Sequence, residues 1–367
     1  MSVLITNAES AKALVVARSL GRKKIPVYVS GQDRLSPTFF SKYIQKKYLY
    51  ADPEKKPEQF IKDILRIIAD CKPRVLIPIN NTETLLLAKN RHRLPKEIVF
   101  PFDDYQKMVQ LSDKYSLYKL AKSLHVPVPL TTTTPSKKLH YPLVLKQRNK
   151  SGNKGLAYIH NQSELEAHYQ PHTNQIIQEY IQGQARGVSC LFNHGKLIAF
   201  LTHQRLREYP ITGGPATYRQ SIGHPEMEKD AIKLLKSLHW HGLAMTEFKY
   251  NPQTHQYYLI EVNPRVWGSI NQGVCSGVDF PYLLYQMAIG KIPKPIKNYQ
   301  LQVKTRFYYN DVRSILAWFW KTKKLSLLKE LLPFSNGLIY NDDLSKDDPL
   351  PGIIFVFQAF KELIKNK

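Results

Sequence analysis

The sequence predicts an α/β fold that opens with a parallel sheet and continues into a strand-rich α+β region. An apolar stretch over 2–6, a helical pattern over about 8–22 and a second apolar stretch over 25–30 form a β–α–β opening. This order is typical of a parallel sheet covered by helices. Two later strand-like stretches, 243–248 and 257–263, flank a turn-rich segment and predict an antiparallel hairpin.

The β–α pattern of the opening repeats up to about residue 110. After the first two strands we expect a helix over about 57–70, a strand over 75–79, a helix over about 82–91 and a strand over 98–100. The loop over 6–10 lacks the glycine-rich dinucleotide fingerprint, which disfavours NAD binding. Residues 1–110 are therefore expected to form an open parallel α/β domain.

A different region begins with a helical pattern over 111–126, which Val126-Pro127-Val128-Pro129 ends. Beyond it we expect strands and helices in alternation: strands at about 141–147, 156–160, 176–181, 187–193 and 196–204, and helices at about 163–170, 226–239 and 279–289. We divide 111–290 into subdomains 111–185 and 186–290. Residues 291–367 are expected to form a basic, aromatic C-terminal extension.

The composition limits the functional classes. In 367 residues there are 53 Lys and Arg against 29 Asp and Glu, a formal net charge of +24, which suggests an acidic partner. The basic residues form neither a long arm nor a basic–aromatic RNA-binding motif, so nucleic acid is disfavoured. A basic surface without a specific partner explains the charge equally well. We see no signal peptide and no membrane-spanning stretch, so a cytoplasmic location is expected.

The hairpin carries the side chains that are most informative about chemistry. Glu261 and Asn263 are two residues apart on one strand and share a face, and Glu247 lies on the preceding strand. Carboxylate and amide oxygens suit Mg²⁺, and Arg265 offers a planar fork for phosphate or carboxylate. The alternative is an edge hairpin with ordinary solvated charges.

Basic side chains precede the hairpin at several points. Lys146 ends a strand before a glycine-containing basic loop, which could offer N–H groups and charge to phosphates. Lys114 lies at a helix start. Arg205 and Arg207 alternate on one strand, so we expect them to share a face and to bind an acceptor carboxylate or an acyl phosphate. Solvated lysines and a salt-bridged sheet surface are the alternatives.

The order of these motifs resembles the ATP-grasp superfamily of carboxylate–amine ligases over about residues 1–290, with a first domain similar to that of the biotin-carboxylase-like branch. The resemblance implies that Lys114 and Lys146 contact the ATP phosphates. It implies a mobile phosphate loop that includes Ser151, Gly152, Lys154 and Gly155, and a hinge that reads adenine through Gln178, Glu179, Tyr180 and Ile181. Many relatives place a ribose-contacting acid just beyond this hinge, where the chain has Gln184-Ala185-Arg186-Gly187, so the ribose contact is unassigned.

The resemblance also implies a metal site and a reaction. Glu247, Glu261 and Asn263 match the Mg²⁺ ligands, with Mn²⁺ as an alternative ion, and Arg265 matches the arginine beside the γ-phosphate and acyl phosphate. With Arg205 and Arg207 it completes the expected catalytic set. The implied enzyme forms an amide or peptide bond through an acyl phosphate and releases ADP and phosphate.

Several alternatives on function and partners stay open. A small-molecule kinase, a carboxylase and a nucleotide- or polyanion-binding module without turnover are the rival functions. The expected substrates are a small carboxylate and an amine, such as an amino acid or a cell-envelope precursor. The apolar stretches of the tail, 315–320 and 353–357, lie near lysines, so they could contact an anionic membrane. Packing on the domain or on a second subunit, as in a homodimer, is the other interpretation.

Overall fold

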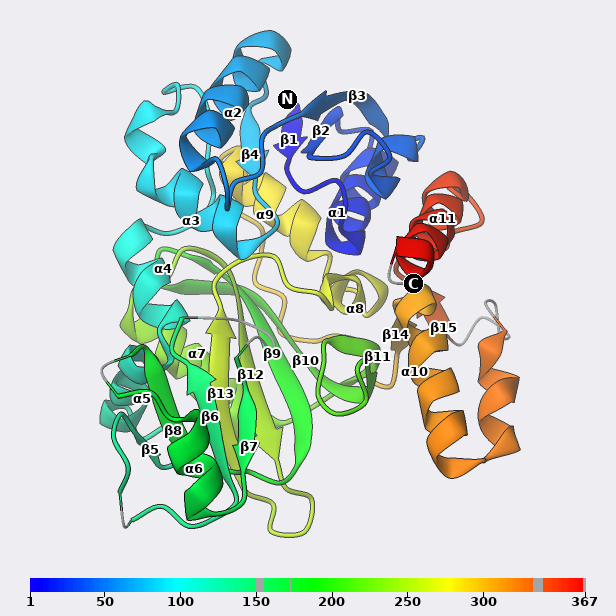
Figure 1. Cartoon of the computed structure of the whole chain (residues 1–367). Helices are drawn as coiled ribbons and strands as arrows, with labels where there is room; N and C mark the ends of the chain where they lie inside the picture. The colour runs from blue at the N-terminus through cyan, green and yellow to red at the C-terminus, as the bar shows by residue number, and fades with distance from the viewer. Residues whose placement is uncertain (137, 150–154, 172, 333–338, 366–367) are drawn as a thin grey trace.

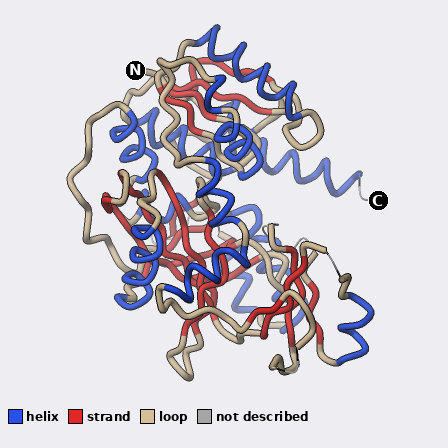
Figure 2. The backbone as a smooth tube through the Cα atoms, turned by 90° about the vertical axis from the view of Figure 1, so that its left-hand side faces the viewer, coloured by secondary structure: helices blue, strands red, loops and turns tan. Residues whose placement is uncertain are grey.

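The computed structural model describes residues 1–136, 138–149, 155–171, 173–332 and 339–365, with the side chains of 359–365 left out. Its strands form three sheets, one of four strands near the N-terminus, one of seven, and a second of four. Figure 1 shows the first sheet above the seven-stranded one, and Figure 2 separates all three. This mixed α/β architecture confirms the predicted fold class.

The first sheet is parallel and has the order β3-β2-β1-β4. It contains β1 (Val3–Ile5), β2 (Val27–Gly31), β3 (Ile44–Leu49) and β4 (Val75–Ile77), and its helices are α1 (Ala11–Arg22), α2 (Pro57–Cys71), α3 (Asn81–Lys89) and the short turns η1 (Pro37–Phe40) and η2 (Arg91–Arg93). Strands β1 and β4 are fully buried apolar triplets, as expected for strands covered on both faces. The sequence prediction missed β3, and the expected strand over 98–100 is only an isolated bridge at Val99.

A pair of helices leads out of this sheet. The expected single helix over 111–126 is two helices, α4 (Tyr105–Ser112) and α5 (Lys114–Ser123). Asp113 separates them because its extended backbone ends α4 and its carboxylate caps α5 by accepting a hydrogen bond from the Ser116 amide at 2.7 Å. This break places Lys114 at the first position of a new helix.

The second four-stranded sheet has the order β5-β8-β6-β7 and is antiparallel. Its elements are β5 (Thr131–Thr132), β6 (Leu143–Gln147), β7 (Ala157–Ile159), helix α6 (Gln162–His168) and β8 (Gln175–Glu179). A small core of six buried apolar residues lies beneath it: Leu139, Leu143, Leu145, Ile159, Leu165 and Ile177. The alternation along β6 directs Leu143 and Leu145 into this core and leaves Lys146 facing the other way.

The seven-stranded sheet has the order β13-β12-β9-β10-β11-β14-β15. Its strands are β9 (Gln184–Asn193), β10 (Lys196–Glu208), β11 (Ala216–Ile222), β12 (Gly242–Tyr250), β13 (Tyr257–Asn263), β14 (Lys304–Arg306) and β15 (Ile339–Asn341). The helices that accompany it are α7 (Pro225–Ser237), α8 (Ile270–Cys275) and α9 (Phe280–Ala288). The expected hairpin is the β12–β13 pair at one edge.

Two short strands from the residues after 290 join this sheet, so the described part of the expected extension is not separate from it. β14 pairs with β11 and β15 pairs with β14, while α10 (Tyr308–Thr322), η3 (Leu325–Leu331) and α11 (Leu350–Lys365) lie beside that edge in Figure 1. Buried ion pairs, such as Arg219 with Asp342, hold the segment in place. Within the described ranges, no helix has the length and apolar composition that a membrane crossing requires.

Candidate active site

Two carboxylates face each other at the β12–β13 edge. Glu247 and Glu261 are direct partners in the antiparallel register, so their side chains lie on the same face of the sheet. The Asn263 amide nitrogen donates to Oε1 of both, at 3.0 Å to Glu247 and 3.2 Å to Glu261. The three side chains that the sequence pointed to as metal ligands are therefore in one cluster.

The electrostatics of this cluster favour a cation. Burial raises the pKa of Glu247, and the neighbouring charge of Glu261 adds to this, while Arg205 acts in the opposite direction. A pair of close carboxylates in a low-dielectric site is costly unless positive charge offsets it. In the described part of the chain no group of three or more His, Cys, Asp or Glu side chains could hold a metal ion. A metal at this edge would be held by the carboxylate oxygens of Glu247 and Glu261, hard ligands that fit Mg²⁺. Asn263 turns its amide nitrogen toward these carboxylates and its oxygen toward Arg265, so it would have to turn its amide to serve as a third oxygen ligand.

Two buried lysines, one from α5 and one from β6, lie beside Glu261 of this cluster. Lys114, from α5, lies 3.8 Å from Glu261 through its Nζ atom. Lys146, from β6, donates a hydrogen bond of 3.2 Å to the Tyr118 hydroxyl, which in turn donates to the Ile260 carbonyl at 2.6 Å. Tyr118 thus joins the two sheets beside the carboxylates. Sequence reasoning missed this residue, although its position four residues after Lys114 on one helix face could have indicated it.

Both lysines sit in an environment that disfavours their charge. Burial lowers the pKa of Lys146 to about 8, against the opposing attraction of Glu261. Burial also lowers the pKa of Lys114, and Glu261 again opposes this shift. An anionic ligand would offset the cost of keeping two ammonium groups protonated here. The position suits phosphate groups.

The two arginines of β10 do not share a face. Arg205 donates to a carboxylate oxygen of Glu247 and, at 3.2 Å, to the Gly214 carbonyl. Arg207 instead binds Asp311 with two hydrogen bonds, of 2.9 and 2.7 Å, and Glu330 with one of 2.6 Å. The register of β10 against β11 shifts between these two arginines, and such a bulge reverses the alternation. The expectation of a shared face was therefore wrong.

A glycine lies between Glu247 and His203 on the same sheet. Gly187 on β9 is the register partner of both Glu247 and His203. A Cβ atom at position 187 would lie 2.5 Å from the His203 ring. The His203 ring therefore lies over bare backbone, where its Nε2 is 3.1 Å from the Ser269 hydroxyl.

The residues that we expect to form the hinge lie at the end of β8 and directly after it. Glu179 accepts a hydrogen bond of 2.8 Å from the Leu130 amide, and Gln178 donates one of 2.8 Å to the Thr131 hydroxyl. Tyr180 is exposed and packs edge-to-face on Tyr158, with ring centroids 5.7 Å apart. The carboxylate of Glu179 is thus engaged with the strand next to it.

Part of the expected phosphate loop lies outside the described residues, namely Ser151, Gly152 and Lys154. Gly155 is described and has φ +74°, a backbone conformation that favours glycine. Just before the loop, Arg148 binds the Asp113 carboxylate with two hydrogen bonds of 2.9 Å. This pair anchors the start of the loop to the helix that carries Lys114.

Arg265 completes the cluster. It donates 2.6 Å to Asn263 Oδ1 and 3.0 Å to the Val266 carbonyl, and burial lowers its pKa. Trp267, two residues further on, is 1% exposed and packs against Phe280, so it belongs to the core.

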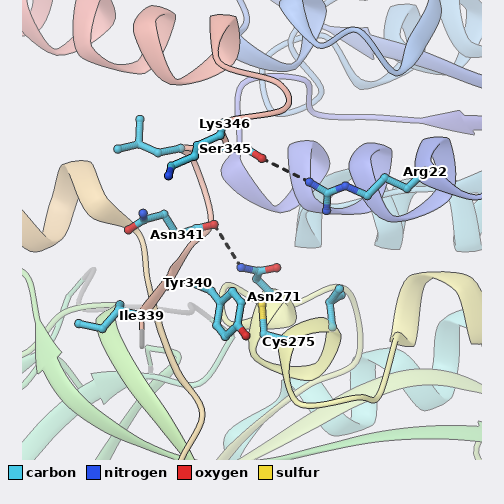
Figure 3. Close-up of a pocket in the computed structure, with 10 residues that line it drawn as sticks. Arg22, Asn271, Cys275, Ile339, Tyr340, Asn341, Ser345 and Lys346 are labelled. Atoms are coloured by element: carbon cyan, nitrogen blue, oxygen red, sulfur yellow. Dashed lines mark hydrogen bonds between the residues drawn. The ribbon is translucent and has the colours of Figure 1, made fainter. Parts of the chain in front are cut away.

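A cavity of about 480 Å³ lies elsewhere on the same sheet. In Figure 3 its walls come from α1, α8, β15 and the loop after β15, and Arg22 and Asn271 reach toward Ser345 and Asn341. Since β15 and β13 are the two edges of the sheet, this cavity is separate from the carboxylate cluster.

Comparison with known proteins places the site in context. Residues 111–269 match a family described as "ATP-grasp domain". The D-aspartate ligase of Enterococcus faecium is 22% identical over 271 residues, which are 64% of this chain and 63% of that protein. Acetyl-CoA carboxylase 1 of Oryza sativa is 30% identical over 138 residues, 34% of this chain and 6% of that protein. The chain spans less than two thirds of the length of these relatives.

Solved structures share the fold. Biotin carboxylase from Campylobacter jejuni superposes with a TM-score of 0.69 at 16% identity, covering 83% of this chain and 74% of that one. L-amino acid ligase from Bacillus licheniformis gives 0.62 at 15% identity, covering 80% and 75%.

Proposed function

We propose that this chain, which matches the ATP-grasp domain family over residues 111–269, is an ATP-dependent ligase that joins a carboxylate to an amine through an acyl phosphate. One observation carries this proposal. Two buried lysines from the β5–β8 side, Lys114 and Lys146, converge with Glu247, Glu261 and Asn263 of the β12–β13 hairpin. Such a site combines the cations that phosphates need with the oxygens that Mg²⁺ needs.

The proposed reaction has two steps. An oxygen of the substrate carboxylate attacks the γ-phosphorus of ATP, the bond to the β–γ bridging oxygen breaks, and ADP leaves. The amine nitrogen then attacks the acyl carbon, the bond to the phosphate oxygen breaks, and the nitrogen loses a proton. Neither step needs a covalent bond to the protein, so catalysis consists of positioning and charge stabilisation.

Residues of this chain supply those functions in the proposal. Glu247, Glu261 and Asn263 would hold Mg²⁺, which lowers the repulsion between phosphate charge and an incoming nucleophile. Lys114 and Lys146 bind phosphate oxygens, and Arg265 neutralises charge at the transferred phosphoryl group. Arg205 holds Glu247 in place through an ion pair and adds a positive charge beside the carboxylates. Arg207 is engaged by Asp311 and Glu330, and we assign it a structural function.

The adenine site and the phosphate loop are assigned from the resemblance to the ATP-grasp superfamily. We place adenine at the hinge of Gln178, Glu179, Tyr180 and Ile181. Because the Glu179 carboxylate already accepts from Leu130, backbone groups of the hinge are the better candidates for base recognition. Ser151, Gly152, Lys154 and Gly155 are proposed to cover the phosphates.

The test is formation of a hydroxamate. Wild-type protein is incubated with MgATP, hydroxylamine and pooled amino acids, and ADP, phosphate and hydroxamate are measured. We expect Glu261→Gln to lower product formation by at least about 100-fold, because the metal site loses one charge. Glu226→Gln, an exposed carboxylate on α7, is the matched control and should equal wild type. Equal rates in Glu261→Gln and wild type would refute the metal assignment.

A carboxylase is the second candidate, because acetyl-CoA carboxylase and biotin carboxylase are among the similar proteins. In that reaction bicarbonate takes the place of the organic acid. Phosphate release that depends on bicarbonate and is indifferent to the amino acid pool would favour it. A kinase would release ADP without free phosphate, and binding of MgATP without any turnover would favour a binding module.

A further inference from the structure

The turn between α10 and η3 exposes apolar and basic side chains together. Trp320 is 67% exposed and Leu325 is 71% exposed, and exposed lysines lie between and after them. We call this surface the α10–η3 tip, and it consists of Trp320, Lys321, Lys323, Lys324, Leu325 and Lys329. In Figure 1 α10 and η3, both orange, extend beyond the seven-stranded sheet at one side of the molecule.

The other face of α10 holds the tip in this position. Asp311, Ser314 and Ile315 are fully buried, and the Ser314 hydroxyl donates a hydrogen bond of 2.9 Å to the Glu208 carbonyl of β10. Leu316 lies one helical turn before Trp320 and is also exposed. The two side chains therefore share a second apolar face, which does not pack on the sheet.

The acidic residues of this segment do not balance the lysines of the tip. Asp311 and Glu330 are the only carboxylates in residues 308–332, and both pair with Arg207 of β10, at 2.7 and 2.6 Å. Asp311 also pairs with Arg306 at 3.8 Å. Within the described ranges, no carboxylate forms an ion pair with a lysine of the tip. Both negative charges thus face the sheet, and the tip carries positive charge only.

Two of the lysines lie on aromatic rings. The Lys323 ammonium group is 4.6 Å from the centroid of the Trp320 ring, and that of Lys321 is 5.2 Å from the centroid of the Trp318 ring. These contacts bring an apolar ring and a cation to the same level. Indole rings favour the headgroup level of a bilayer, and lysines can reach lipid phosphates while their stems lie along apolar surface.

We propose that the α10–η3 tip attaches the protein to the surface of an anionic membrane. Trp320 and Leu325 enter the boundary between headgroups and acyl chains, and the lysines bind lipid phosphates. A soluble polyanion would use the lysines but would gain nothing from an exposed leucine, so the combination favours a lipid surface. The net charge of +24 adds attraction at longer range.

Membrane attachment of this kind is independent of the proposed ligase function. The segment that carries the tip adds β14 and β15 to the sheet on the side opposite to β13. The tip is therefore separate from the carboxylate cluster, and its binding can be measured without ATP or turnover.

The first experiment is co-sedimentation of the whole protein with lipid vesicles. Vesicles of phosphatidylcholine with phosphatidylglycerol are compared with vesicles of phosphatidylcholine alone, at low and at physiological salt. We expect binding to the anionic vesicles only, with a smaller bound fraction at the higher salt, because salt screens the lysines. Equal binding to both kinds of vesicle, or binding to neither, would overturn the proposal.

Paired substitutions test the apolar part of the tip. Trp320→Ser combined with Leu325→Ser should weaken binding to the anionic vesicles by at least about 10-fold, because the buried apolar area is lost. Ile292→Ser combined with Leu301→Ser changes two side chains that are 54% and 56% exposed elsewhere, and this control should bind as wild type. Equal losses in the two double variants would contradict a contact at the tip.

A second pair tests the charge. Lys323→Gln combined with Lys324→Gln should weaken binding by about 25-fold, since each lysine near an anionic surface contributes about a factor of five. Lys55→Gln combined with Lys56→Gln removes the same charge from exposed positions of the first domain and should change binding by at most about 2-fold. All four double variants should keep the wild-type melting temperature. A loss caused by the lysine pair alone, with none from the apolar pair, would indicate a soluble polyanion and overturn the proposal.

A second copy of the chain is the other occupant that must be distinguished. Sedimentation velocity without vesicles compares the wild type with the Trp320→Ser and Leu325→Ser double variant. We expect the same oligomeric state for both. Dissociation of a wild-type oligomer by these two substitutions would assign the tip to a subunit interface and overturn membrane attachment.

Discussion

Glu247 and Glu261 stand opposite each other across β12 and β13, and the Asn263 amide bridges them. This pairing follows from the register of the hairpin, which places both carboxylates on one face. The face continues over Gly187 to His203 on β10. Positive charge near the carboxylates is supplied by Arg205 of the same sheet, by Lys114 of α5 and by Lys146 of β6.

Lys146 should control the affinity for ATP. Lys146→Met keeps the length of the buried side chain and removes its charge, so we expect MgATP to bind about 10- to 100-fold more weakly. The melting temperature should not fall, because an ammonium group that burial disfavours is replaced by an apolar group. Isothermal titration calorimetry measures the affinity. Lys122→Met, an exposed position on α5, is the control and should bind as wild type.

The same residue predicts a pH dependence. The pKa of Lys146 is lowered to about 8 by burial, and only the protonated form attracts phosphate. Affinity for MgATP should therefore be constant below about pH 8 and fall as the pH rises above it. In Lys146→Arg the guanidinium stays charged, so the fall should disappear. A decrease of equal size in both proteins would locate the titrating group elsewhere.

Arg205 and Arg207 should have opposite effects on activity and stability. Arg205→Gln removes the cation bound to Glu247, and we expect turnover to fall by at least about 10-fold with little change in unfolding free energy. Arg207→Gln removes the two hydrogen bonds that Arg207 donates to the fully buried Asp311. Asp311 then keeps the hydrogen bond from Thr217 and the ion pair with Arg306. We expect it to destabilise the protein by about 3 kcal/mol. Urea unfolding and steady-state rates distinguish the two, and the reverse assignment of effects would contradict the structure.

The C-terminal segment should stabilise the first domain through Arg18. This buried guanidinium donates to Asp348 Oδ2 at 2.9 Å and to the carbonyls of Asp342, Asp343 and Asp348, at 3.0, 3.1 and 2.7 Å. Arg18→Met should lower the unfolding free energy by about 3–5 kcal/mol, because Asp348 remains buried without its partner.

A matched control lies one helical turn further along α1. Arg22 pairs with Asp347 at 3.0 Å, and both side chains are more than 40% exposed. Arg22→Met should cost no more than about 1 kcal/mol. Both unfolding free energies are measured by urea unfolding. Equal decreases in the two variants would show that burial does not increase the contribution of the Arg18 contacts to stability.

Strands β1, β2 and β4 of the first sheet could be predicted from the sequence because short apolar runs alternate with helical periodicity. Strand β3 was missed because its sequence, Ile44–Leu49, is polar and exposed at its centre. The acidic hairpin could be predicted because two side chains two residues apart on a strand always share a face. These are local rules, since they depend only on backbone geometry and on the spacing of residues in the chain. The three members of the carboxylate cluster follow from them directly.

Tertiary structure decided what the spacing could not. A bulge between Arg205 and Arg207 separates two arginines that strict alternation would pair, and bulges depend on the neighbouring strand. The short strands β14 and β15 carry little pattern of their own and exist because β11 offers an open edge. Arg18 and Asp348 are 330 positions apart in the chain. They meet only when the C-terminal segment packs against the first domain, and interactions over such distances leave no periodic signal in a single sequence.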